Sequence, residues 1–185
     1  MKNISVIGSG TMGNGIAHLF AQQGFSVALV DLSTDQLQKG MAAIAKNMDR
    51  QISKETLTEA EKAASLQRIV PFTTLADGVK IADLVVEAAT EKLEIKLELF
   101  RELDRLAPSS AILASNTSSI PIQEIADATQ RPQQVIGMHF MNPVPVMKLV
   151  EVIKSPATNQ EVTDKTVSLR KELGKIPCDV NDFPG

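Results

Sequence analysis

Several residue types are scarce or missing in this 185-residue sequence, and each absence excludes a class of protein. Cys178 is the only cysteine, so no intramolecular disulfide can form, and we interpret it as a structural residue in a reducing compartment. Tryptophan and tyrosine are absent, which excludes acid–base catalysis by a tyrosine hydroxyl. No apolar run approaches the ~20 residues that span a membrane. These absences exclude disulfide-stapled and membrane-spanning proteins.

The charge of the chain is nearly balanced. Its 19 basic and 22 acidic residues give a net charge of −3 and are interspersed along the sequence. This pattern predicts neither a nucleic-acid partner nor a membrane partner. Residues 1–7 lead directly into a strand pattern without the features of a signal peptide. We therefore predict a cytoplasmic globular protein, or one from an organelle matrix if a targeting segment has been removed, and we predict no metal site.

Short apolar runs alternate with helical segments along the whole chain, which predicts a doubly wound, mostly parallel α/β sheet. Strands are predicted at Ile4–Ile7, Val27–Asp31, Ile69–Phe72, Leu84–Glu87, Ile112–Ser115, Val135–His139, Lys148–Ile153 and Ile176–Val180. Helices are predicted at Met12–Gln23, Thr34–Ile52, Thr58–Leu66, Glu91–Leu106 and Asn159–Leu173. Residues 34–68 exceed what one crossover helix needs, so they are interpreted as a helical hairpin inserted after the second strand.

A glycine-rich segment follows the first predicted strand. Residues 6–17 read VIGSGTMGNGIA, in which Gly8, Gly10 and Gly13 form G-x-G-x-x-G at the start of a helix. This pattern gives a tight turn, close approach of the backbone to a pyrophosphate and close packing of helix on strand. Asp31 ends the second strand, where a carboxylate accepts hydrogen bonds from the adenosine ribose and repels a 2′-phosphate. The segment predicts a Rossmann-type site for NAD rather than NADP.

A histidine and a glutamate stand 12 residues apart in the segment GMHFMNPVPVMKLVEVI, residues 137–153. His139 ends one predicted strand and Glu151 lies on the next, so a carboxylate can hold one nitrogen of the imidazole and leave the other free as an acid or base. On the residues alone, a structural histidine and an edge-strand glutamate explain the pattern as well. His18, in the middle of the first predicted helix, is interpreted as packing.

Four segments in this order resemble the 3-hydroxyacyl-CoA dehydrogenase family: GSGTMGNGIA, VVEAATEKLEIK, SNTSSI and GMHFMNPVPVMKLVEVI. The resemblance covers essentially the whole chain and is most specific in the last segment. It implies hydride transfer between NAD and the 3-position of (S)-3-hydroxyacyl-CoA or 3-oxoacyl-CoA, with His139 as general acid/base and Glu151 as its orienting partner. It also implies that Ser118 bonds the reacting oxygen and that Asn142 holds the nicotinamide side.

The remaining site residues are assigned from the glycine motif and from this resemblance together. The cofactor set comprises Gly8, Ser9, Gly10, Thr11, Met12, Gly13, Asp31, Glu91, Lys96, Ser118 and Asn142. The acyl-CoA set comprises Ser118 with Lys54 and Asn47 of the helical hairpin.

Family members continue past a V-x-D-x-P-G-F motif into an all-helical domain that dimerises and covers the acyl chain. Here VNDFPG ends at Gly185. Residues 1–185 are accordingly expected to be the NAD-binding domain alone, with a cut at the domain junction favoured over a natural fragment. This piece is expected to have poor activity by itself, and the full-length protein is expected to form a homodimer through the missing domain.

Two alternatives stay open. The first is another two-domain dehydrogenase, acting on a small hydroxy acid or sugar acid, although that class usually carries a lysine acid/base in later helices. The second is a non-catalytic NAD-binding protein, against which the retention of His139, Glu151, Ser118 and Asn142 argues. Oxidation of 3-hydroxybutyryl-CoA with NAD separates these possibilities. The sequence does not settle acyl-chain preference, metabolic direction or pathway.

Overall fold

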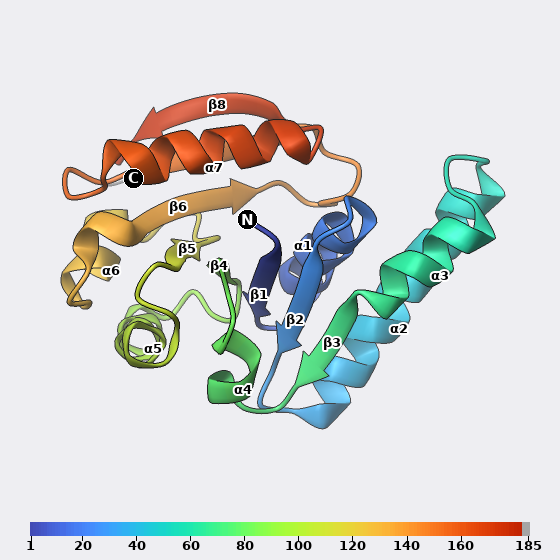
Figure 1. Cartoon of the computed structure of the whole chain (residues 1–185), viewed down its shortest axis with the longest axis horizontal. Helices are drawn as coiled ribbons and strands as arrows, with labels where there is room; N and C mark the ends of the chain where they lie inside the picture. Colours follow the sequence, from blue (N-terminus) through green and yellow to red (C-terminus); the bar gives the residue numbers. More distant parts are fainter. Residues whose placement is uncertain (183–185) are drawn as a thin grey trace.

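The computed structural model describes residues 1–182, with the backbone alone for residues 177–181, so the side chain of Cys178 lies outside the description. Its centre is one eight-stranded sheet in the order β3-β2-β1-β4-β5-β6-β7-β8 (Figure 1). The strands are β1 Asn3–Ile7, β2 Ser26–Val30, β3 Ile69–Phe72, β4 Leu84–Glu87, β5 Ile112–Ser115, β6 Val135–Phe140, β7 Leu149–Lys154 and β8 Ile176–Asn181.

The first six strands are parallel, whereas β7 is antiparallel to β6 and β8 is parallel to β7. The strand order reverses between β1 and β4, which pair from Ile4–Ile7 to Leu84–Glu87. Parallel sheets bind ligands at such a switch point, outside the carboxyl ends of the strands. The predicted doubly wound, mostly parallel sheet is confirmed.

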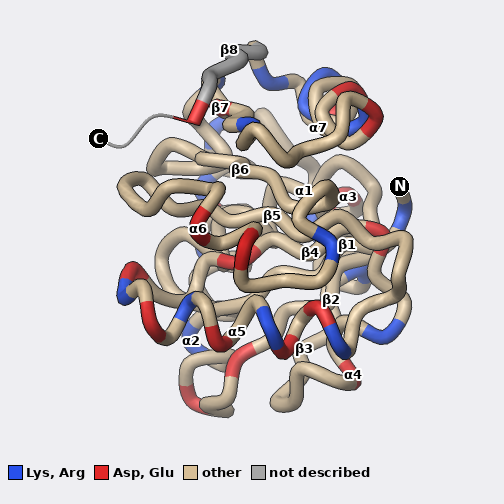
Figure 2. The backbone as a smooth tube through the Cα atoms, turned by 90° about the vertical axis from the view of Figure 1, so that its left-hand side faces the viewer, with Lys and Arg blue, Asp and Glu red and all other residues tan. Residues whose placement is uncertain are grey.

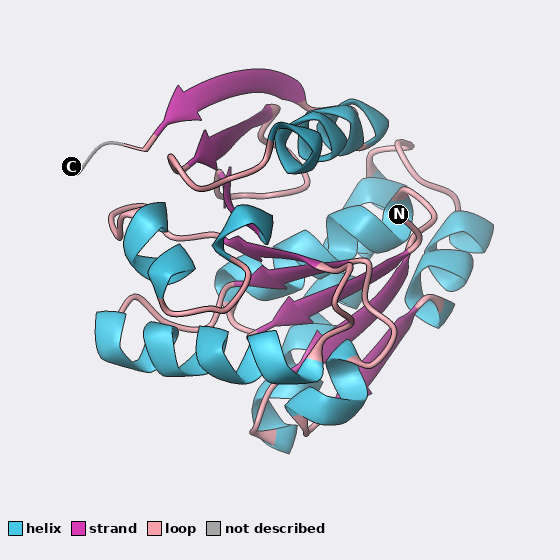
Figure 3. Ribbon diagram, turned by 60° about the vertical axis from the view of Figure 1, so that its left-hand side comes forward, coloured by secondary structure: helices cyan, strands magenta, loops and turns pink. Residues whose placement is uncertain are grey.

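Helices cover both faces of this sheet (Figure 3). They are α1 Thr11–Gln22, α2 Thr34–Ser53, α3 Glu59–Gln67, α4 Leu75–Val79, α5 Leu93–Leu106, α6 Ile122–Asp127, the 3₁₀ turn η1 Pro132–Gln134 and α7 Gln160–Glu172. Side chains alternate between two cores, because successive residues of a strand face opposite sides. One core joins the sheet to α1, α2 and α7, and the other joins it to α4, α5 and α6.

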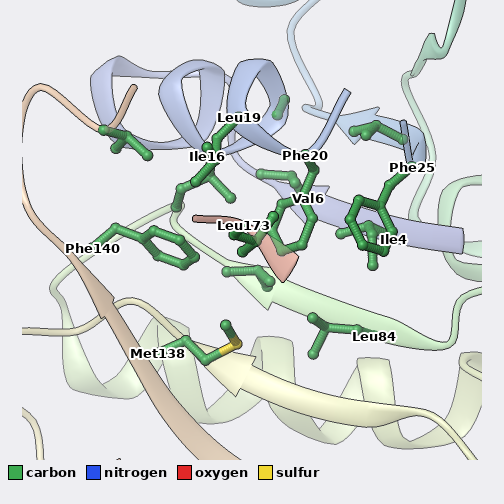
Figure 4. Packing of buried hydrophobic residues seen from close by; sticks show 14 of the residues in the cluster. Ile4, Val6, Ile16, Leu19, Phe20, Phe25, Leu84, Met138, Phe140 and Leu173 are labelled. Carbon is green, nitrogen blue, oxygen red and sulfur yellow. The ribbon is translucent and has the colours of Figure 1, made fainter. Parts of the chain in front are cut away.

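The larger core is built around Phe20 of α1 (Figure 4). Its ring meets Phe25 and Phe140 edge-on, with centroid separations of 5.5 and 6.3 Å. Ile4 and Leu84 lie beside these rings on the adjacent strands β1 and β4. This packing fixes α1, and with it the turn between β1 and α1, over the switch point of the sheet.

The helical hairpin predicted at residues 34–68 is present as α2 and α3, which run side by side away from the sheet (Figure 1). Ser33 caps α2 by accepting a hydrogen bond from the Gln36 amide. Thr58 and Glu61 form the capping box that begins α3. The short helix α4 is not among the predicted elements, because its five residues carry too little periodicity to be recognised.

Charged residues are dispersed over the molecule (Figure 2). On the face shown, lysine and arginine alternate with aspartate and glutamate, and no single sign dominates. Within residues 1–182, no helix combines the length and apolar character that crossing a bilayer requires.

His18, a residue of α1, is fully buried in the protein core, as the sequence predicts. Its Nε2 is 3.2 Å from Oε1 of Gln51, and Nε2 of Gln51 in turn donates to Oε1 of Gln22. Burial lowers the pKa of His18, against smaller opposing contributions from its hydrogen bonds to Gln51 and Gln22. The imidazole is therefore neutral in the folded protein and ties the hairpin to α1.

This histidine makes stability depend on pH. Its pKa is lowered on folding, so below about pH 6.5 the unfolded chain binds a proton that the folded chain does not. The free energy of unfolding should fall as pH drops from 7.5 to 5.5, and urea titrations at both values measure the change. His18→Gln should weaken that dependence while keeping a hydrogen-bonding amide. An unchanged dependence in His18→Gln would show that other groups cause it.

Candidate active site

Two glycines in the turn between β1 and α1 are required by contacts within the protein itself. Gly8 has a φ of +95°, and a Cβ there would lie 2.7 Å from the Ala88 carbonyl oxygen at the end of β4. A Cβ at Gly13 would lie 1.8 Å from the Gly8 carbonyl oxygen. These two positions therefore close the turn against the sheet.

Gly10 differs from its neighbours. Its φ is −63°, and a Cβ there would meet nothing within 4 Å. The protein itself thus gives no reason for glycine at this position. The first turn of α1, which contains Thr11 and Met12, has no side-chain cap, so its amides point at the space that Gly10 leaves open. A pyrophosphate fits this arrangement, because it needs free amides and a close backbone approach.

Asp31 stands beside this turn, immediately after β2. Its Oδ2 accepts hydrogen bonds from the Ser9 amide at 2.9 Å and the Ser9 hydroxyl at 2.8 Å. Its Oδ1 accepts one from the Ser33 amide at 3.1 Å. The carboxylate is therefore held at the rim of the glycine turn, where an adenosine ribose would lie in a Rossmann-type site.

A cleft of about 1010 Å³ extends from Gly10 past Asp31. Leu32, Leu75 and Ile95 give it apolar walls that suit an adenine ring. Within the described part of the chain its lining includes four acidic side chains and no basic one: Asp31, Glu94, Glu98 and Glu102. No cation is therefore placed to receive a 2′-phosphate.

A buried ion pair lies beneath the loop that follows β4. The Lys96 ammonium donates to Oε2 of Glu87, and the Ser115 hydroxyl donates to the same oxygen at 2.8 Å. Oε1 of Glu87 accepts hydrogen bonds from the amides of Ala89 and Thr90. All three side chains of this cluster are at most 1% exposed. Lys96, which the sequence predicts to lie beside the cofactor, thus pairs with the glutamate that holds the loop amides.

Glu91 connects that loop to the one after β5. Its Oε1 accepts hydrogen bonds from the Thr117 hydroxyl at 2.6 Å, the Ser118 amide at 2.9 Å and the Ser118 hydroxyl at 3.4 Å. Burial raises the pKa of Glu91, but the hydrogen bonds from Thr117 and Ser118 and the charge of Lys96 outweigh burial and lower it overall. Glu91 is therefore ionised at neutral pH and fixes the position of Ser118.

His139 and Glu151 form a cross-strand pair. They face each other in the antiparallel register of β6 and β7, and Nδ1 of His139 lies 2.8 Å from Oε2 of Glu151. The two side chains are 23% and 30% exposed, so solvent or a ligand can reach the imidazole. Among residues 1–182 no hydrogen bond is made by Nε2. An imidazole held in this way has one tautomer and one free nitrogen.

The loop between these strands carries Asn142, and two contacts hold it. Val144 packs against Gly15 of α1, where a Cβ would lie 3.0 Å from the valine side chain. The Lys175 ammonium donates to the carbonyl oxygens of Val144 at 2.7 Å and Met147 at 2.6 Å. Burial lowers the pKa of Lys175. The loop is thereby fixed beside the helix of the glycine turn.

These contacts gather most of the predicted residues at one edge of the sheet. The Asn116 side chain accepts a hydrogen bond from the Phe140 amide at 2.9 Å, which links the loop of Ser118 to the strand of His139. Asn47 and Lys54 are not part of this cluster. Asn47 accepts a hydrogen bond from Arg50, and Lys54 is an exposed residue that ends α2, with no described hydrogen bond to the other site residues.

Sequence reasoning missed Glu87, Ser115, Asn116 and Lys175. Glu87 could have been found, because it ends the otherwise apolar strand LVVE and a buried carboxylate needs a partner. Lys175 gave no such signal, since lysine before a strand is ordinary at a surface.

Comparison with known proteins agrees with this geometry. Residues 3–183 match the family described as 3-hydroxyacyl-CoA dehydrogenase, NAD binding domain. The probable 3-hydroxybutyryl-CoA dehydrogenase of Bacillus subtilis is 47% identical over 185 residues, which are 100% of this chain and 64% of the relative. The mitochondrial hydroxyacyl-coenzyme A dehydrogenase of Homo sapiens is 45% identical over 191 residues, covering 100% of this chain and 60% of that protein.

Solved structures give the same result. The 3-hydroxybutyryl-CoA dehydrogenase of Escherichia coli K12 superposes with a TM-score of 0.97 at 40% identity, covering 100% of this chain and 39% of that one. Prephenate dehydrogenase from A. aeolicus, at 14% identity and a TM-score of 0.67, shares the fold alone. The chain thus spans 60–64% of the length of the curated relatives named above. On its sequence match and its NAD-type turn, the chain belongs to the NAD-binding domain family of the 3-hydroxyacyl-CoA dehydrogenases.

Proposed function

We propose that the protein containing this chain transfers a hydride between NAD and the 3-position of (S)-3-hydroxyacyl-CoA or 3-oxoacyl-CoA. The observation that carries the proposal is the 2.8 Å contact between His139 and Glu151 at the sheet edge that also bears the glycine turn. A base fixed beside a dinucleotide site is what alcohol oxidation requires, because the hydroxyl must lose its proton as the hydride leaves carbon.

In this mechanism His139 is the general acid/base and Glu151 positions it. The carboxylate accepts a hydrogen bond from the Nδ1–H group, so Nε2 is the nitrogen that takes the substrate hydroxyl proton during oxidation and returns it during reduction. As the ring becomes cationic, the adjacent carboxylate stabilises it. NAD, when bound, supplies the hydride acceptor.

Ser118 and Asn142 position the reactants in this proposal. Glu91 holds the loop through the Ser118 amide, and the Ser118 hydroxyl, whose contact with Glu91 is long at 3.4 Å, turns from Glu91 to donate to the reacting oxygen. Asn142 holds the nicotinamide side from a loop that Lys175 fixes. The cofactor site comprises the glycine turn from Gly8 to Gly13, Asp31 and the other residues predicted for it.

The substrate class is proposed as acyl-CoA, with Lys54 and Asn47 of the hairpin contacting the CoA nucleotide. Asn47 lies on α2 and Lys54 directly follows this helix, so both stand outside the catalytic cluster, which is compatible with a long ligand that reaches the reacting atoms only at one end. A homodimer formed through a second, all-helical domain and a cytoplasmic location complete the proposal.

The decisive experiment is an NADH oxidation assay with acetoacetyl-CoA. The complete gene product should reduce this substrate, whereas residues 1–185 should bind NADH with similar affinity and turn over far more slowly. Catalysis depends on holding the reactants in contact and excluding water, and in this proposal the second, all-helical domain supplies the cover for the acyl group. No activity in the complete protein would overturn the proposal, and native turnover by residues 1–185 would refute the need for a cover.

The same preparation tests the choice of cofactor. NADPH should bind at least about tenfold more weakly than NADH, because its 2′-phosphate would face Asp31 and an acidic cleft. Fluorescence titration measures both affinities, and Asp31→Asn is the matched variant that should narrow the difference. Equal affinities in the unmodified protein would contradict the assignment of Asp31 to the ribose.

A further inference from the structure

Helix α2 carries a glycine at a position where its own periodicity calls for a large apolar residue. Leu37, Ile44 and Met48 form the buried stripe of this helix, and Gly40 lies on the same stripe between them. Glycine inside a helix costs about 1 kcal/mol relative to alanine. Nothing in the local sequence compensates for that cost, so its reason lies in what the helix packs against.

That neighbour is the glycine turn of the cofactor site. A Cβ at Gly40 would lie 2.8 Å from the Ser9 carbonyl oxygen and 3.2 Å from the Ser9 Cβ. The nearest obstacle is a backbone atom, which no side-chain rotation can remove. Glycine therefore allows the backbone of α2 to approach the peptide that joins Ser9 to Gly10.

Ser9 is also held by Asp31. Its amide and hydroxyl both donate to Oδ2 of Asp31, at 2.9 and 2.8 Å, which are already normal hydrogen-bond lengths. The N-cap of the same helix, Ser33, donates its amide to the other oxygen of that carboxylate. Helix α2 thus contacts both members of the Ser9–Asp31 pair, one at its N-cap and the other through Gly40.

We propose that Gly40 is a positioning residue through which α2 holds Ser9 against Asp31 and so sets the affinity for the adenosine half of NAD. The inference rests on the assignment of Asp31 to the adenosine ribose. If an added methyl group separates α2 from the turn, the Ser9 peptide and the carboxylate lose their fixed relation, although no atom of Gly40 touches the cofactor.

The test is Gly40→Ala in the complete protein. The dissociation constants of NADH and of ADP-ribose should both rise by at least about tenfold, the effect of a clash that displaces packed backbone. The KM for NADH should rise while kcat at saturating NADH stays close to that of the unmodified enzyme. A separate reading of thermal unfolding distinguishes a cofactor effect from loss of structure.

Ala42→Gly is the matched control, because Ala42 is exposed on the same helix. It should lower the unfolding temperature and leave both dissociation constants unchanged. If Gly40→Ala does not fold, Leu37→Ala replaces it, with the equally buried Met48→Ala farther along α2 as its control; only Leu37→Ala should weaken NADH binding.

The outcomes separate this inference from the proposed function. Unchanged NADH and ADP-ribose affinities in Gly40→Ala, or equal losses in Leu37→Ala and Met48→Ala, would overturn the role of α2. Absence of NADH binding by the unmodified protein would instead overturn the function on which it rests.

Discussion

Replacing Glu151 with glutamine in the complete enzyme should lower kcat by roughly 10²- to 10⁴-fold and leave the dissociation constant of NADH almost unchanged. The amide keeps the size of the side chain but loses the charge that stabilises an imidazolium. An amide also can present a donor to Nδ1 and select the wrong tautomer. The upper figure is the loss seen when the orienting carboxylate of a serine protease becomes an amide.

Steady-state reduction of acetoacetyl-CoA and an NADH fluorescence titration measure the two quantities. Glu161→Gln is the control, since Glu161 is an exposed carboxylate of α7 that pairs with Lys165. It should have unaltered turnover. A Glu151→Gln enzyme with near-native turnover would mean that this glutamate serves the structure of β7 and not the reaction.

Lys96→Met should cost about 3–5 kcal/mol of the free energy of unfolding, the largest stability effect expected in this chain. The substitution leaves the carboxylate of Glu87, which is 0% exposed, without the ammonium that balances its charge. Urea denaturation measures the loss. Adding Glu87→Leu to Lys96→Met should recover part of it, because the isolated buried charge is then removed.

Arg101→Met is the matched control for that experiment. Arg101 and Glu98 form an ion pair at 3.0 Å on the same helix, but their side chains are 52% and 69% exposed. Water already solvates both charges, so the change should be under about 1 kcal/mol. If Lys96→Met and Arg101→Met lowered the free energy of unfolding by similar amounts, burial of the Glu87 charge could not be the cause of the loss in Lys96→Met.

The fold was predictable from sequence because the buried parallel strands are continuous apolar runs. β3, β4 and β5 have the predicted bounds, and helix starts at Ser33 and Thr58 follow from capping side chains. Segments without such signals could not be found. The five residues of α4 make little more than one turn, which is too short for a periodic pattern.

The candidate site was predictable where chemistry needs one residue type at one spacing. The glycines and Asp31 were predicted in this way, whereas the roles of His139 and Glu151 were predicted only through the resemblance to the 3-hydroxyacyl-CoA dehydrogenases, and the structure places these two side chains in contact. Glu87 and Lys175 were not predicted, since their partners, the Lys96 ammonium for Glu87 and the Val144 carbonyl for Lys175, are fixed only by folding, although the apolar strand LVVE signals that Glu87 has a partner. No spacing rule relates a lysine at the start of β8 to a loop about 30 residues earlier. Long-range contacts of this kind depend on tertiary packing.

The register of β6 and β7 limits the insertions and deletions that these two strands can accept. His139 and Glu151 meet because they occupy opposed positions on one face of a hairpin. Successive residues of a strand alternate between faces, so one residue inserted into β7 ahead of Glu151 would turn that carboxylate to the opposite face. A single inserted residue would keep the pair facing only if a β-bulge absorbed it before Glu151.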